Sequence, residues 1–183
     1  MTRIISGSAR GRSIDVPKEG TRPTSERVRE ALFSSLGHRM GNWANVHVLD
    51  MFAGTAALSF EALSRGASSA TAIEKDRHAC DVIRKNSMHL KLPLSVLCED
   101  VSRFLIRPSS KTFGVVFIDP PYVMPSEEVS SLIALLKSNN YLAVGSVVVV
   151  ERSRRSADVV FPDELSIEDD RLYGETRIIT AVW

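Results

Sequence analysis

Five short apolar runs alternate with amphipathic segments between residues 46 and 151, and this alternation constrains the fold more than any other feature of the sequence. The runs are rich in β-branched residues, which is typical of buried strands, whereas the segments between them have the apolar spacing of helices. Strands and helices that alternate in this way form parallel sheets with right-handed crossovers, so an α/β fold is predicted. The expected strands are residues 46–52, 69–74, 94–98, 113–119 and 146–151, and the expected helices are residues 57–65, 76–90, 101–106 and 127–138.

The N-terminal part of the chain precedes this pattern. Residues 3–5 and 12–16 are β-prone and enclose a glycine-containing loop, which predicts a hairpin. A helix is expected next, with Thr24 or Ser25 as its N-cap and Gly37 just past its end.

The C-terminal part also departs from the alternation. Residues 165–172 and 176–183 are β-prone and flank a glycine-containing turn, which predicts an antiparallel hairpin at one edge of the sheet. The expected organisation is therefore an N-terminal extension, residues 1–40, and a main α/β domain, residues 41–183.

The tetrapeptide Asp119-Pro120-Pro121-Tyr122 follows the fourth predicted strand. Prolines have no backbone N–H and end a strand ladder, so Asp119 is placed at the carboxyl edge of the sheet, where open α/β folds bind ligands. The Asp119 carboxylate and the Pro120 carbonyl can both accept hydrogen bonds there, and the Tyr122 ring can stack on a planar group. The motif is typical of a site for the amino group of a nucleobase, although a simple strand-terminating turn has the same sequence signature.

Acidic residues end four successive predicted strands, at Asp50, Glu74, Asp100 and Asp119. Asp50 could face a cationic amino-acid group, Glu74 could accept from ribose hydroxyls, and Asp100 could accept from an adenine amino group. Each acid alone could equally be a helix N-cap or a surface charge. The loop after the first strand has only one glycine, Gly54, which disfavours a pyrophosphate-bearing dinucleotide such as NAD. The four acids together predict S-adenosylmethionine as the cofactor.

Charge is distributed unevenly along the 183 residues. The net charge is only +1, but residues 1–39 hold eight Lys/Arg against four Asp/Glu. This excess indicates either a nucleic-acid contact or a solvated basic helix. No signal peptide or membrane span is evident, which predicts a cytoplasmic protein. Cys80 and Cys98 lack metal-like spacing and are expected to be buried free thiols, with no metal site.

Together these motifs resemble a known family. The runs Leu49–Thr55 and Glu74-Lys75-Asp76, with Asp100 and Asp119–Tyr122, resemble class I S-adenosylmethionine-dependent methyltransferases that act on nucleobase amino groups. The segment Arg22–Phe33, the Arg10-Gly11-Arg12 loop and Tyr173–Thr176 look like the RsmD family, which methylates N2 of one guanine in small-subunit (16S) ribosomal RNA.

The resemblance implies a fold, a set of site residues and partners. The implied fold is Rossmann-like, with a mostly parallel seven-stranded sheet, an antiparallel C-terminal edge, and an N-terminal hairpin and helix. The implied partner is ribosomal RNA within an assembling 30S subunit, and the protein is expected to be a monomer. The implied catalytic residues are Asp119, Pro120 and Tyr122; the cofactor residues are Asp50, Phe52, Ala53, Gly54, Thr55, Glu74, Lys75, Asp100, Val101 and Asp119; and the RNA-binding residues are Arg10, Arg12, Arg22, Thr24, Arg27, Arg29 and Pro121.

Two departures from the family pattern affect the cofactor loop. Ala56 and Ser59 stand where the family usually has glycine. A positive φ, or close contact with the cofactor, would make the Ala56 Cβ unfavourable. The alternatives to the RsmD function are an N6-adenine methyltransferase acting on DNA or RNA, and a ribosome-assembly RNA-binding protein without catalysis.

Overall fold

The computed structural model describes residues 2–17 and 25–183, so Arg22 and Thr24 lie outside the described part of the chain. The predicted alternation of strands and helices is confirmed. The elements are β1 (Thr2–Arg3), β2 (Ser13–Ile14), α1 (Glu26–Met40), β3 (His47–Asp50), α2 (Ala57–Ser64), β4 (Ser69–Glu74), α3 (Arg77–Leu90), β5 (Leu94–Cys98), α4 (Val101–Leu105), β6 (Phe113–Ile118), α5 (Ser126–Ser138), β7 (Leu142–Ser153), β8 (Ser166–Tyr173) and β9 (Thr176–Val182).

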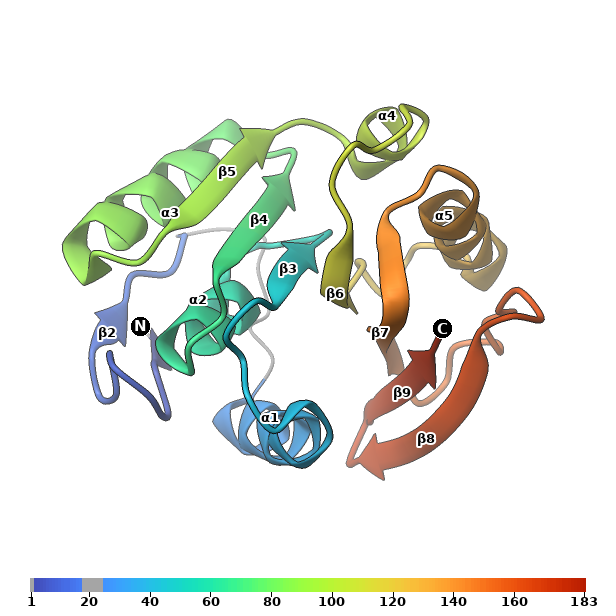
Figure 1. Ribbon diagram of the computed structural model, residues 1–183, viewed down its shortest axis with the longest axis horizontal. Coiled ribbons are helices and arrows are strands. Elements are labelled where there is room, and N and C mark those ends of the chain that lie inside the picture. The colour runs from blue at the N-terminus through green and yellow to red at the C-terminus, as the bar shows by residue number, and fades with distance from the viewer. Residues whose placement is uncertain (1, 18–24) are drawn as a thin grey trace.

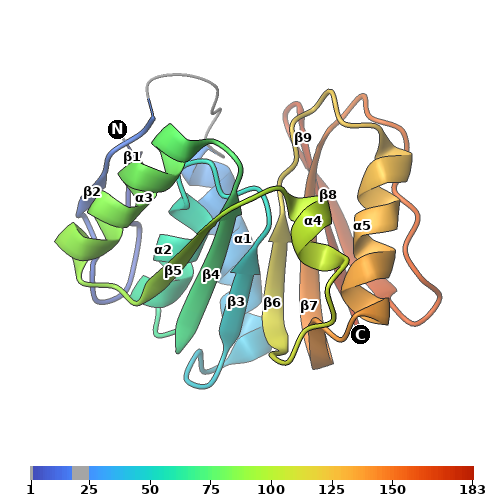
Figure 2. The same ribbon diagram turned by 90° about the horizontal axis from the view of Figure 1, so that it is seen from above.

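The main sheet has seven strands in the order β5-β4-β3-β6-β7-β9-β8 (Figure 1). The first five of these strands pair in parallel, and β9 joins β7 and β8 antiparallel. The short β1–β2 hairpin lies beside α3 near the β5 end of the sheet, and β8 and β9 lie at the other end (Figure 2). This is a Rossmann-like architecture with the expected antiparallel C-terminal edge.

Each face of the sheet carries its own hydrophobic core because strand side chains alternate between the two faces. One core joins α4 and α5 to Leu49, Val116 and Val148. The other joins α1 and α2 to Val48 and Val115. Figure 1 shows α1 and α2 on one side of the sheet and α4 and α5 on the other. The helices thus cover both faces and leave the carboxyl ends of the parallel strands as the place for a site.

The N-terminal hairpin is attached to α2 by buried polar contacts. The carboxylate of Glu61, fully buried in α2, accepts from the backbone N–H groups of Ile5 and Ser6 at 2.7 and 3.1 Å. Gly7 has a φ of +86°, and a Cβ there would lie 1.8 Å from the carbonyl oxygen of Ser64. Only glycine permits the backbone of residue 7 to lie this close to the end of α2. Buried residues of the hairpin also share a hydrophobic cluster with residues of the main domain.

Some sequence expectations are corrected. Helix α1 has Ser25 as its N-cap, as expected, but it continues through Gly37 and ends at Met40. Gly37 is tolerated because the cost of about 1 kcal/mol for an interior glycine is smaller than the gain from packing the helix. Strand β7 is twice as long as predicted, since its first residues pair with β6 before the register shifts. Cys80 is buried as expected, whereas Cys98 is exposed.

Candidate functional site

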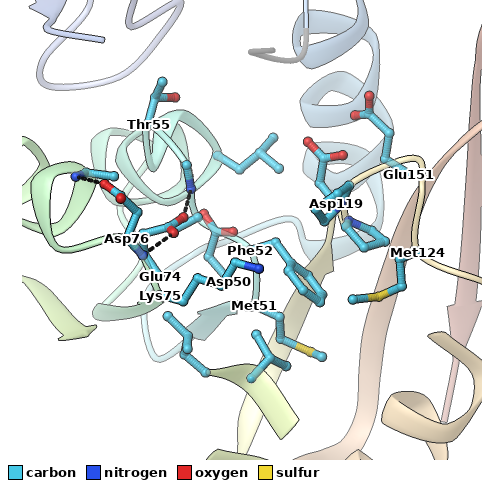
Figure 3. Close-up of a pocket in the computed structure, with 18 of the residues that line it drawn as sticks. Asp50, Met51, Phe52, Thr55, Glu74, Lys75, Asp76, Asp119, Met124 and Glu151 are labelled. Carbon is cyan, nitrogen blue, oxygen red and sulfur yellow. Dashed lines mark hydrogen bonds between the residues drawn. The ribbon is translucent and has the colours of Figure 1, made fainter. Parts of the chain in front are cut away.

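A cavity of about 620 Å³ lies at the carboxyl ends of the parallel strands. It gathers side chains from the ends of β3, β4, β5 and β6, which are far apart in the sequence (Figure 3). The cavity is lined by the predicted residues Asp50, Phe52, Ala53, Gly54, Thr55, Glu74, Lys75, Asp100, Val101, Asp119, Pro120, Pro121 and Tyr122. The structure therefore brings these expected catalytic and cofactor residues, with Pro121, to one place.

Asp50 is held at the end of β3 by the first turns of α2. Its side chain is only 2% exposed, and the Ser59 hydroxyl donates a 2.8 Å hydrogen bond to its Oδ2. Burial raises the pKa of Asp50 to about 6, because a carboxylate without water is destabilised. The hydrogen bonds from Ser59 act in the opposite direction and the charge of Glu74 adds to the increase. A cation placed next to Asp50 would be strongly favoured.

Glu74 organises the loop that follows β3. Its Oε2 accepts from the Gly54 backbone N–H at 2.9 Å, and its Oε1 accepts from the Asp76 backbone N–H at 2.8 Å, as the dashed lines in Figure 3 show. Asp76 in turn caps α3 by accepting from the Ala79 N–H at 2.7 Å. The Glu74 carboxylate thus has a fixed orientation at the cavity wall, and each of its oxygens can accept a further hydrogen bond.

Asp100 has the structural role that the sequence left open. It is the N-cap of α4, where its Oδ1 accepts from the backbone N–H groups of Ser102 and Arg103 at 2.9 and 3.3 Å. It also lines the cavity, next to Glu99 and Val101. Capping fixes the carboxylate without preventing a ligand contact, because an ionised carboxylate has about four acceptor sites.

The two residues that replace glycine behave differently. Ala56 has a φ of +56°, in the left-handed region that favours glycine, and its fully buried side chain belongs to the same hydrophobic cluster as Ile4 and Phe60. The strain expected for a positive φ is therefore present, but the Ala56 Cβ faces the core. Ser59 lies in α2 and supplies the hydrogen bond to Asp50. The substitution at residue 59 thus adds a polar contact to the site.

Asp119 lies at the opposite end of the cavity from Glu74 and Asp76 (Figure 3), and Tyr122 also lines the cavity. The Tyr122 hydroxyl donates to Oε1 of Glu151, at the carboxyl end of the neighbouring strand β7, at 3.4 Å. The buried guanidinium of Arg152, the next residue on β7, donates to the carbonyl oxygen of Met124 at 2.6 Å. Burial lowers the pKa of Arg152, and the negative charge of nearby Asp119 partly offsets that effect.

The predicted RNA-binding arginines do not share one environment. Arg10 at the hairpin tip and Arg27 on α1 are exposed. The half-buried Arg12 donates to the carbonyl oxygens of His89 and Leu90. These hydrogen bonds connect the hairpin to the end of α3. Arg22 and Thr24 lie outside the described residues.

Arg29 is a correction. The sequence predicted it to be an RNA-binding residue, but it is fully buried. Its Nη2 donates to the Arg3 carbonyl oxygen at 2.6 Å and to the Thr2 hydroxyl at 3.2 Å. Burial lowers its pKa, with the charges of Glu61 and Glu26 acting against that change. The helix period alone could not show this, because the partner is the hairpin from another part of the chain.

Several cavity residues were missed by sequence reasoning. Met51 and Met124 contribute apolar surface, and Glu99 and Glu151 contribute further carboxylates. Glu151 carried the same signal as the four predicted acids, since it was expected to end the fifth strand. Within residues 2–17 and 25–183, no group of three or more His, Cys, Asp and Glu side chains is arranged to hold a metal ion. No helix in these ranges is long and apolar enough to cross a bilayer.

Comparison with known proteins gives relatives that match almost the whole chain. The family described as Conserved hypothetical protein 95 matches residues 2–182. Ribosomal RNA small subunit methyltransferase D of Escherichia coli strain K12 is 34% identical over 174 residues, covering 94% of this chain and 85% of that protein. The protein of the same name from Haemophilus influenzae is 34% identical over 182 residues, covering 94% of this chain and 89% of that protein.

Solved structures of similar proteins also match almost the whole length of this chain. The structure of yhhF from Escherichia coli superposes with a TM-score of 0.86 at 32% identity, covering 99% of this chain and 97% of that chain. Magnesium protoporphyrin IX methyltransferase from Synechocystis PCC 6803, solved with bound SAM, has a TM-score of 0.64 at 17% identity and covers 89% of this chain and 86% of that chain. The second likeness concerns the fold alone. The family match and the two 34% identical relatives show that the chain belongs to the Conserved hypothetical protein 95 family, the RsmD-type S-adenosylmethionine-dependent methyltransferases.

Proposed function

We propose that this protein transfers a methyl group from S-adenosylmethionine to the N2 amino group of one guanine in small-subunit (16S) ribosomal RNA. The observation that carries the proposal is the position of Asp119-Pro120-Pro121-Tyr122, which lines the same cavity as the acids at the ends of β3, β4 and β5. One end of the cavity suits a cofactor and the other suits a base. The name of the 34% identical relatives supports small-subunit ribosomal RNA as the source of that base.

The cofactor end fits S-adenosylmethionine by the chemistry of its acceptors. Asp50, buried beneath the loop, suits an ammonium group, because a neighbouring cation would lower its raised pKa. The oriented Glu74 carboxylate suits ribose hydroxyls, and Asp100 suits an adenine amino group. A pyrophosphate in the same place would meet several carboxylates. The remaining contacts are assigned to Phe52, Ala53, Gly54, Thr55, Lys75 and Val101.

At the end of the cavity near Asp119, the protein would activate the weakly nucleophilic amino group of the base. The lone pair of a guanine amino group is delocalised into the ring, and hydrogen bonds from that group to Asp119 and the Pro120 carbonyl would favour its localisation on nitrogen. The Tyr122 ring would hold the plane of the base by stacking. When bound, S-adenosylmethionine supplies an electrophilic methyl group. Asp119 would take the amino proton, which becomes acidic only as the new bond forms.

The RNA contacts remain a proposal from sequence and exposure. Arg10 and Arg27 are exposed and suit phosphate contacts. Pro121, exposed at the cavity edge, suits contact with the flipped-out nucleotide. Residues 1–40 would act as the RNA-contacting extension, with Arg22 and Thr24 included from the sequence and Arg12 also serving to hold the hairpin. We propose that a cytoplasmic monomer acts on an assembling 30S particle.

Transfer of a labelled methyl group tests this function. The purified protein should label small-subunit rRNA at guanine N2, and Asp119→Ala should lose this labelling while calorimetry shows that the variant still binds the cofactor. Naked rRNA and partly assembled particles should be compared as substrates. Labelling at adenine N6 instead would favour the alternative enzyme, and cofactor binding without any transfer would favour a non-catalytic assembly protein.

A further inference from the structure

We propose that Glu151 is a specificity-determining residue that reads the N1–H of the target guanine. The inference rests on the proposed function and adds to it a means of distinguishing guanine from adenine. Asp119 and the proline carbonyl accept from any exocyclic amino group, so they cannot by themselves make this choice. A second acceptor beside the amino group can distinguish guanine from adenine.

The sheet register places Glu151 next to Asp119. Strands β6 and β7 pair in parallel with Ile118 opposite Val150. The residues that follow this pair are Asp119, just past the end of β6, and Glu151 on β7. Neighbouring residues in register point to the same face of a sheet. Both residues line the cavity, and Figure 3 shows their carboxylates close together on one side of it. Two acceptors thus stand side by side where the base is expected.

Glu151 is also held in place. Its side chain is 7% exposed, and its Oε1 accepts from the hydroxyl of Tyr122, the residue proposed to stack on the base. Its backbone lies between those of β6 and β9, with Ile178 as its β9 partner. Arg152, the next residue on β7, faces the other side of the strand and places a buried cation near Asp119. That cation offsets part of the repulsion between the two carboxylates.

The pair of acceptors matches the hydrogen-bonding edge of guanine. Guanine presents its 2-amino group next to N1–H, so two adjacent donors would meet Asp119 and Glu151. Adenine presents its 6-amino group next to an N1 lone pair, which would face the Glu151 carboxylate with no hydrogen between them. Two acceptors that face each other with no hydrogen between them are strongly unfavourable. Glu151 would therefore reject adenine even though Asp119 accepts its amino group.

The test combines Glu151→Gln with a base analogue. 2-Aminopurine keeps the 2-amino group but has a lone pair at N1 and lacks O6. Particles are reconstituted with rRNA in which the target guanine, once mapped, is replaced by 2-aminopurine. Wild-type kcat/KM should fall by about 10- to 100-fold or more on the analogue, the range for one hydrogen bond to a charged group. In Glu151→Gln the ratio of kcat/KM for guanine to kcat/KM for the analogue should be at least about 10-fold smaller than in the wild type, because the glutamine amide can donate to N1 of the analogue. The loss of O6 affects both enzymes equally and therefore cancels in this comparison.

Two controls keep the result interpretable. Glu99→Gln removes a different carboxylate from the same cavity, and its guanine-to-analogue ratio should equal that of the wild type. Fluorescence of the unstacked 2-aminopurine, measured with S-adenosylhomocysteine in place of the cofactor, should show tighter analogue binding by Glu151→Gln than by the wild type. Equal ratios in the wild type and Glu151→Gln would overturn the inference while leaving guanine methylation intact. A wild type that methylates adenine and not guanine would overturn the proposed function as well.

Discussion

The hydroxyl of Ser59 donates a 2.8 Å hydrogen bond to Oδ2 of Asp50, and both side chains are almost completely buried. This contact joins the first turn of α2 to the end of β3, at the wall of the cavity. The RsmD pattern usually has glycine at residue 59, so the hydroxyl is a feature of this chain. It stabilises the ionised form of a carboxylate that burial would otherwise keep protonated at a higher pH.

Removing this hydroxyl should change the pH dependence of cofactor binding. Ser59→Ala is expected to raise the pKa of Asp50 further above about 6. In a plot of the Kd for S-adenosylmethionine against pH, the midpoint of the transition should therefore move to a higher pH. Near pH 6 the Kd should rise by roughly 10-fold, and the difference should shrink at higher pH. Calorimetry from pH 5 to 8 measures this. Ser64→Ala removes another buried hydroxyl of α2, which contacts the hairpin, and should lower stability without moving the midpoint.

Asp50 should also make the ligand-free protein less stable as the pH rises. Its pKa is about 6 in the folded protein against an ordinary value of 3.8, so the folded state holds a proton that the unfolded state loses. The free energy of unfolding should therefore fall between about pH 4 and pH 6, with a contribution of about 3 kcal/mol from this group. Asp50→Asn should reduce that fall, as denaturant titrations over this range would show. An unchanged slope in Asp50→Asn would contradict this account of the buried carboxylate.

Restoring the glycine of the family at residue 56 should leave cofactor affinity almost unchanged. In Ala56→Gly the relief of a positive φ is offset by the lost burial of one methyl group and by a more flexible unfolded chain. Each of these contributions is on the order of 1 kcal/mol. Because the Ala56 side chain belongs to the buried cluster that contains Ile4 and Phe60, the Kd for S-adenosylmethionine should stay within about 2-fold. A 10-fold tighter Kd would show that Ala56 limits the site.

Two hairpin glycines offer a matched pair for testing the attachment of the N-terminal segment. Gly7→Ala places a Cβ 1.8 Å from the Ser64 carbonyl oxygen at a φ of +86°, whereas Gly11→Ala has a similar φ of +78° but no atom within 4 Å. Gly11→Ala should cost only about 1–2 kcal/mol of left-handed strain. Gly7→Ala should cost several kcal/mol, since backbone must move as well. Thermal unfolding of the two variants compares them, and equal losses would mean that the hairpin is not packed on α2.

Much of the fold and of the cavity followed from local sequence patterns. Strands β4 and β5 begin and end at the predicted residues, because each apolar run is bounded by a turn or an acid. The strand-end acids converge because parallel strands bring their carboxyl ends to one edge. The burial of Arg29 depends on a hairpin more than twenty residues away, and the role of Ser59 depends on its distance from Asp50 in space. Contacts of this kind carry no periodic signal in the sequence.

We propose that the Asp119-Pro120-Pro121-Tyr122 site methylates guanine N2 in small-subunit rRNA. The most direct measurement is mass-spectrometric mapping of modified nucleosides in small-subunit rRNA from cells that lack this protein. One N2-methylguanosine should be missing, a plasmid carrying the wild-type gene should restore it, and Asp119→Ala should not. An rRNA with every N2-methylguanosine present in the deletion strain would contradict the claim.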